Sequence, residues 1–123
     1  MKILITGNLG YVGSSLIPII KKRMTHAKLF GFDTGYFSHL LAPANISPEL
    51  NLEAQYFGDI RRFSPDLLLG IDAIVHLAAI SNDPLGNRFA TQTNAINLES
   101  GKALVRAAKK NGVSKFIFAS SCS

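Results

Sequence analysis

Short apolar runs alternate with longer helical patterns along this chain. The first run, Lys2 to Thr6, is bounded by glycine and is typical of a strand buried on both faces. A helical pattern follows from Tyr11 to Arg23. Its apolar positions, which we expect to face a sheet, are Val12, Leu16, Ile19 and Ile20. Four further apolar runs predict strands at residues 27–33, 53–58, 73–79 and 115–119.

The second half of the chain predicts one long helix. It runs from about Ala90 to Lys110, and Asn111-Gly112 is its expected C-terminal stop. The side chains expected on its buried side are Ile96, Ala103, Leu104 and Ala107. Residues 65–70 predict a brief helical turn, and residues 81–87 a loop. Strands that alternate with helices in this way are typical of an α/β fold with a parallel sheet.

Composition indicates one globular domain, residues 1–123, in which 47% of the residues are hydrophobic and 17% are charged. The single Cys122 excludes an internal disulfide, and the histidines are too scattered for a metal site. There is no apolar stretch of about eighteen residues and no signal-peptide pattern, so we expect a cytoplasmic protein with no membrane partner.

The basic residues change this picture little. A formal charge of +5 raises the question of a nucleic-acid partner. The basic residues are dispersed, however, in short groups such as Lys21-Lys22-Arg23 and Lys109-Lys110, at predicted helix ends where cations interact favourably with the helix dipole. We interpret them as solvated helix ends and predict no nucleic-acid partner.

Candidate chemistry lies between the first strand and the first helix. Gly7, Gly10 and Gly13 could provide a sharp bend, a close approach of backbone to a pyrophosphate, and close packing of helix on strand. Asp33 follows Gly13 by twenty residues, at the end of the second predicted strand, where a carboxylate could bind ribose hydroxyls. Taken singly, Asp33 could equally be a turn residue before Thr34-Gly35. Strand, glycines and acid together predict a dinucleotide site.

With these residues in view, the chain resembles the extended short-chain dehydrogenase/reductase family of sugar-nucleotide epimerases and dehydratases. Residues 6–13, Thr-Gly-Asn-Leu-Gly-Tyr-Val-Gly, resemble that family's T-G-x-x-G-[FY]-[IV]-G opening. Asp59-Ile60-Arg61 resembles its D-[IL]-R motif, and residues 75–79 resemble V-x-H-L-A-A. Residues 97–101 are a looser match to N-V-x-G-T, and residues 116–123 match the strand that normally continues into V-Y-G.

The resemblance implies a Rossmann-type, doubly wound parallel sheet with five strands in the order 3-2-1-4-5. It implies NAD as the cofactor and a nucleotide-activated sugar as the substrate. Asp33 would favour NAD over NADP, because a 2′-phosphate would meet a carboxylate without an adjacent arginine. The implied cofactor-binding residues are Gly7, Gly10, Tyr11, Val12 and Gly13 for the pyrophosphate, Asp33 for the ribose, Asp59 and Ile60 for the adenine, and Leu77, Ala78 and Ala79 for the nicotinamide side.

Ser121 aligns with the family's active-site Ser or Thr and is the implied catalytic residue, although Ser120 or Ser123 could be the serine that faces the site. Without the resemblance, this serine cluster would be interpreted as a polar strand end. His76 is predicted to be a core histidine whose ring is satisfied by backbone groups. Ser81, Asn82 and Asp83 could contact a substrate, but turn chemistry explains them equally well.

The chain departs from the family in one respect. The family's general acid/base is the Tyr of a Tyr-x-x-x-Lys pair, and none of Tyr11, Tyr36 and Tyr56 has a lysine four residues on. We therefore expect the amino-terminal portion of a larger enzyme, truncated relative to the family and inactive alone. A non-catalytic dinucleotide sensor or scaffold and an NAD(P)-dependent carbonyl reductase are the alternatives. A homodimer is a further expectation from the family.

Overall fold

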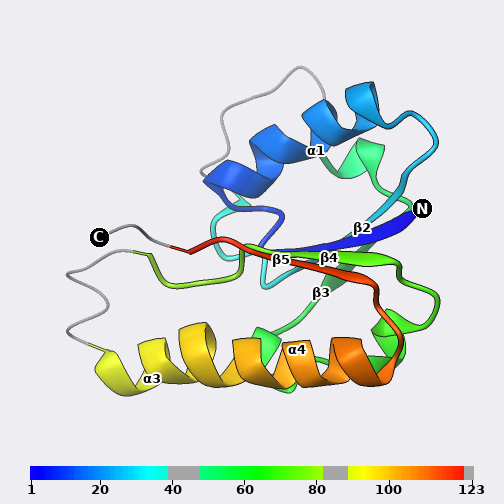
Figure 1. Ribbon diagram of the computed structural model, residues 1–123. Helices are drawn as coiled ribbons and strands as arrows, with labels where there is room; N and C mark the ends of the chain where they lie inside the picture. Colours follow the sequence, from blue (N-terminus) through cyan, green and yellow to red (C-terminus); the bar gives the residue numbers. More distant parts are fainter. Residues whose placement is uncertain (39–47, 82–88, 121–123) are drawn as a thin grey trace.

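The computed structural model describes residues 1–38, 48–81 and 89–120 (Figure 1). Five parallel strands form one sheet: β1 (Lys2–Thr6), β2 (Lys28–Asp33), β3 (Ala54–Phe57), β4 (Ala73–His76) and β5 (Lys115–Phe118). Their order is β3-β2-β1-β4-β5, so the predicted topology is confirmed. The reversal of strand order beside β1 is the position where doubly wound sheets bind ligands.

Helices cover both faces of the sheet. Helix α1 (Tyr11–Arg23) lies on one face, and α3 (Ala90–Asn94) and α4 (Ser100–Lys110) lie on the other (Figure 1). The predicted long helix is interrupted by a π-helical segment, η5 (Ala95–Glu99). Three short 3₁₀ turns complete the described elements: η2 (Pro48–Asn51), η3 (Ile60–Arg62) and η4 (Pro65–Leu68). Among the described residues, no helix is both long and apolar enough to cross a membrane.

Strand β1 contributes to two cores, one on each side of the sheet. Ile3 and Ile5 belong to the core with Ile17 of α1. Leu4 belongs to the opposite core with Leu104 of α4. Successive side chains of a strand point to opposite faces, so the continuous apolar run reflects burial on both sides, as predicted.

The predicted helix faces need two corrections. Val12 and Ile19 are exposed, at 57% and 49%, and the buried residues of α1 are Gly13 and Ile17. The apolar stripe of α1 is wider than the surface that the helix buries against the sheet. Gly13 lies so close to the backbone of Asn8 that this contact sets which side of the helix faces inward. On α4, Ala103 is exposed. Leu104 is buried as predicted, and Ala108, one turn further on, is buried as well.

The fourth strand is shorter than predicted. It was expected to reach Ala79, but it ends at His76. The Leu77 N–H still donates to the Thr6 carbonyl at 2.9 Å, after which the chain leaves the sheet. Leu77, Ala78 and Ala79 therefore form a segment beyond the sheet edge, beside the glycine-rich turn.

Candidate dinucleotide site

The glycine-rich turn connects β1 to α1. Gly7 has a φ of +73°, and a Cβ there would stand 2.6 Å from the Ala78 nitrogen. Only glycine meets both conditions without strain. A Cβ at Gly13 would lie 2.5 Å from the Asn8 Cα, so the start of α1 packs directly on the turn. The turn is thus held between the end of β4 and the first turn of α1.

The start of α1 suits an anion. Gly10 is the N-cap residue, and as a glycine it has no side chain that could cap the first N–H groups. No acidic residue occupies the first helical turn. Tyr11 and Val12 are exposed. The first N–H groups of a helix have no partner within the helix, and the helix dipole adds partial positive charge. The first turn of α1 therefore carries no carboxylate of its own and fits a pyrophosphate.

Asp33 joins the turn to the second strand. Its Oδ2 accepts a hydrogen bond from the Leu9 N–H at 3.0 Å, and its Oδ1 accepts one from the Gly35 N–H at 2.9 Å. These bonds hold the carboxylate at the carboxyl end of β2. Each oxygen has a further lone pair, so the group can still accept hydrogen bonds from ribose hydroxyls. The sequence did not indicate the contact with Leu9.

The end of β3 lies beside Asp33. The Gly58 N–H donates to the Asp33 carbonyl at 2.9 Å. Asp59 then caps η3 by accepting from the Arg61 N–H, and it forms an ion pair with the Arg61 guanidinium. The hydrogen bond from Arg61 lowers the pKa of Asp59 below its ordinary value. Ile60 is buried. Asp59 and Ile60 follow the carboxyl end of β3, whose last residue, Phe57, is paired with Asp33.

The fourth strand end completes the edge. The Leu77 and Ala78 backbone packs against Gly7, and Ala79 is exposed. Asn97 of η5 holds the next residue: its Oδ1 accepts from the Ile80 N–H, and its Nδ2 donates to the Ile80 carbonyl, both at 2.8 Å. The sequence indicated Asn97 only through a loose motif match, and its bonds to Ile80 depend on the fold.

His76 differs from the prediction. It is 1% exposed, as a core histidine should be, but its Nδ1 bonds the Thr6 hydroxyl at 2.6 Å and not a backbone group. Its Nε2 has no hydrogen-bond partner among the described residues and points to the Gly101 side of α4. Burial lowers the pKa of this imidazole. The neutral ring therefore links the ends of β1 and β4.

The predicted residues Gly7, Gly10, Tyr11, Val12, Gly13, Asp33, Asp59, Ile60, Leu77, Ala78 and Ala79 lie at or just beyond the carboxyl ends of β1, β2, β3 and β4. Parallel pairing brings these four strand ends to one edge of the sheet. Ser121, the predicted catalytic residue, lies outside the described residues, as do Ser123, Asn82 and Asp83.

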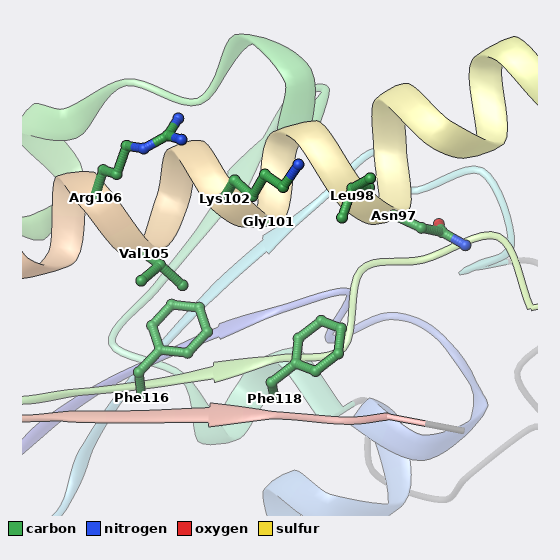
Figure 2. Close-up of a pocket in the computed structure, with 8 residues that line it drawn as sticks. All are labelled: Asn97, Leu98, Gly101, Lys102, Val105, Arg106, Phe116 and Phe118. Carbon is green, nitrogen blue, oxygen red and sulfur yellow. The ribbon is translucent and has the colours of Figure 1, made fainter. Parts of the chain in front are cut away.

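A groove of about 400 Å³ lies between α4 and β5 (Figure 2). Val105 points from the helix toward Phe116, and the ring of Phe118 stands on the same strand. None of the predicted dinucleotide-binding residues lines the groove. Its lining residues are Asn97, Leu98, Gly101, Lys102, Val105, Arg106, Phe116 and Phe118. It is a separate, mainly apolar surface beside strand β5.

Residues 3–123 match the model of the NAD-dependent epimerase/dehydratase family. The chain belongs to this family. The match confirms the predicted family, and with it the cofactor class that the glycine-rich turn and Asp33 indicated. Family membership also agrees with the strand order and with the position of the predicted site at the switch in that order.

Two relatives of the chain are named as an epimerase and a dehydrogenase. The chain is 32% identical to an uncharacterized UDP-glucose epimerase, YtcB, of Bacillus subtilis, covering 100% of this chain and 40% of that protein. It is 30% identical to a 3-beta-hydroxysteroid dehydrogenase of Mycolicibacterium neoaurum, covering 98% of this chain and 32% of that protein. The chain thus spans well under half the length of these relatives.

A solved structure supports the fold. The UDP-glucose-4-epimerase of Stenotrophomonas maltophila, with bound NAD and formylated UDP-arabinopyranose, superimposes with a TM-score of 0.80 at 23% identity. The match covers 99% of this chain and 37% of that one. At this identity the likeness establishes the shared fold.

Proposed function

We propose that these residues form the NAD-binding portion of an epimerase or dehydratase that acts on a nucleotide-activated sugar. The observation that carries the proposal is the bond between Asp33 and the Leu9 N–H, which makes the glycine-rich turn and the ribose-binding carboxylate one unit. The bound NAD and nucleotide sugar of the Stenotrophomonas maltophila epimerase support the same assignment.

Each strand end has a proposed role. The turn and the start of α1 would hold the pyrophosphate through Gly7, Gly10, Tyr11, Val12 and Gly13. Asp33 would accept hydrogen bonds from the ribose hydroxyls, Asp59 and Ile60 would contact the adenine, and residues 77–79 would line the nicotinamide side. Bound NAD would supply the hydride acceptor for transient oxidation of a sugar hydroxyl. Ser121 would hydrogen-bond the reacting sugar oxygen.

Catalysis needs a group that these residues lack. No tyrosine of the sequence has a lysine four residues on, so no tyrosine is paired to remove the hydroxyl proton. We propose that the 123 residues alone bind NAD without turning over substrate. Incubation with NAD and a panel of UDP-sugars should give neither NADH nor an epimer, and measurable turnover would refute this part of the proposal. A cytoplasmic location and a homodimer stay predictions.

Cofactor binding is tested by calorimetric titration of the protein with NAD and with NADP. We expect NAD to bind more tightly, because the Asp33 carboxylate repels a 2′-phosphate. Asp33→Asn should weaken NAD binding about tenfold, or about 1.4 kcal/mol, and should narrow the difference between the two cofactors. Asp66→Asn, the same change at an exposed carboxylate on η4, is the matched control and should bind like the wild type. Equal affinity of the wild type and Asp33→Asn would contradict the proposal.

A carbonyl reductase or hydroxyl dehydrogenase is the second candidate, and the similarity to the hydroxysteroid dehydrogenase favours it. A preference for NADP in the same titration would support this candidate over a sugar-nucleotide enzyme. The third reading, a non-catalytic dinucleotide sensor or scaffold, requires NAD binding without turnover by the whole protein.

A further inference from the structure

A pair of hydrogen-bonded amide side chains, one buried and one partly buried, connects the glycine-rich turn to β3. Asn8, the residue after Gly7, has no exposed surface. Its Nδ2 donates to Gln55 Oε1 at 2.6 Å, and Gln55 Nε2 donates back to Asn8 Oδ1 at 3.3 Å. Gln55 Nε2 also donates to the Tyr56 carbonyl at 2.9 Å. Two reciprocal bonds therefore join residues that lie 47 positions apart in the sequence.

Glycine at position 31 makes room for this pair. Gly31 of β2 lies between Ile5 of β1 and Gln55 of β3 in the strand register. A Cβ at Gly31 would collide with Gln55 Oε1 and would stand 2.5 Å from Asn8 Nδ2. The Asn8 side chain thus reaches β3 across the place where a β2 side chain would otherwise stand. A glycine within a strand has an entropic cost, which this contact explains.

The same residue is held by its backbone in the turn. The Asn8 Cα and carbonyl oxygen lie against Gly13 of α1, so close that a Cβ at Gly13 would come within 2.5 Å of both atoms. The next N–H along the chain, that of Leu9, is the one that bonds Asp33. The position of the Asn8 backbone therefore sets the direction of the Leu9 N–H.

We propose that the Asn8–Gln55 amide pair is a positioning device that holds the glycine-rich turn in its ligand-binding conformation before NAD arrives. The inference rests on the proposed NAD-binding function. Because Asn8 is fully buried, leaving its amide donor or acceptor without a partner would destabilise the fold, so the side chain is held toward Gln55. A turn that is already in place needs no ordering when the dinucleotide binds, which strengthens affinity.

The test uses three variants of similar side-chain size: Asn8→Leu, Gln55→Met, and the two combined. Each single change should weaken NAD binding about tenfold. In the ligand-free protein it should also speed amide hydrogen exchange at Leu9 and Gly10. The double variant removes both amides, so its stability should recover toward the wild type, since apolar replacement of both partners is nearly neutral. Its NAD affinity should stay low, a result that a purely structural role for the pair does not produce.

One control variant and two further outcomes separate the possible failures. Ile71→Val lies in the core on the α4 side and should lower stability without changing exchange at Leu9 or NAD affinity. If the double variant regains NAD affinity with its stability, or if exchange at Leu9 and Gly10 is the same in all proteins, the positioning role is overturned. If the wild type fails to bind NAD, the proposed function fails, and the exchange measurement alone still decides whether the pair holds the turn.

Discussion

His76, at the carboxyl end of β4, is a buried polar residue that both fills space in the core and makes a hydrogen bond. Its ring fills space between the sheet and α4, near Phe116 and Phe118, while its Nδ1 bonds Thr6. An imidazole in this place is stable only when neutral, because charging it would place an unpaired cation in the core. Burial of His76 should therefore make the free energy of unfolding depend on pH.

Burial lowers the pKa of His76 in the folded protein below its ordinary value of 6.5. The unfolded chain then binds more protons than the folded one as pH falls below that value, so stability decreases with falling pH in this range and is unaffected by His76 above it. His76→Gln should lose less stability between about pH 7.5 and pH 5.5 than the wild type does. Urea unfolding at several pH values measures this. His26→Gln, at an exposed histidine, should keep the wild-type dependence. Identical slopes for the wild type and His76→Gln would show that burial of this ring is not the cause.

The interruption between α3 and α4 affects the segment that follows β4. The π-helical segment η5 separates α3 from α4, and it carries Asn97 at the position where the side chain meets the Ile80 backbone. Such segments recur near functional sites because they shift a side chain out of the regular helical register. The element therefore holds the chain as it leaves β4, next to residues 77–79.

Asn97→Ala should lower the free energy of unfolding by about 1–3 kcal/mol, because it leaves the Ile80 N–H and carbonyl without partners. It should also increase amide exchange at Leu77 and Ile80. Asn94→Ala, on an exposed position of the preceding α3, is the control and should change both quantities little. Equal effects of the two substitutions would indicate that the Asn97 bonds to Ile80 contribute nothing specific.

On the scale of the whole molecule, β5 forms one edge of the described sheet. Ile117 and Phe118 are each 54% exposed, on opposite faces of the strand. Exposed apolar edge strands favour pairing between molecules. The formal charge of +5 opposes such pairing by mutual repulsion, and salt screens that repulsion.

The 123-residue chain should therefore self-associate, and more strongly at high salt than at low salt. Ile117→Lys should reduce the association by placing a charge on the edge strand. Leu69→Lys adds the same charge at a side chain that is 70% exposed but lies outside the sheet, and it should have a smaller effect. Sedimentation velocity at two salt concentrations measures the self-association of the wild type and of the two variants. A monomeric wild type at both concentrations would contradict the prediction.

What the sequence determined by itself is local or repeated along the chain. The strands, their parallel arrangement and the position of the glycine-rich turn follow from apolar runs, glycine spacing and family motifs, each of which is a short-range signal. The places of Gly7 and Gly13 in the turn and of Asp33 at the end of β2 could be predicted because the backbone geometry of a strand–turn–helix unit restricts which residues fit there. Asp59 could be placed with them because parallel strands bring their carboxyl ends to one edge.

The tertiary structure alone decided which polar groups meet across the sheet. Thr6 as the partner of His76, Gln55 as the partner of Asn8, and Ile80 as the partner of Asn97 all join positions far apart in sequence. It also decided that α1 turns Gly13 inward and leaves Val12 exposed. The physical reason is that apolar burial requires only a face, which periodicity reveals, whereas a hydrogen bond requires two atoms at a set distance, which depends on strand register and packing.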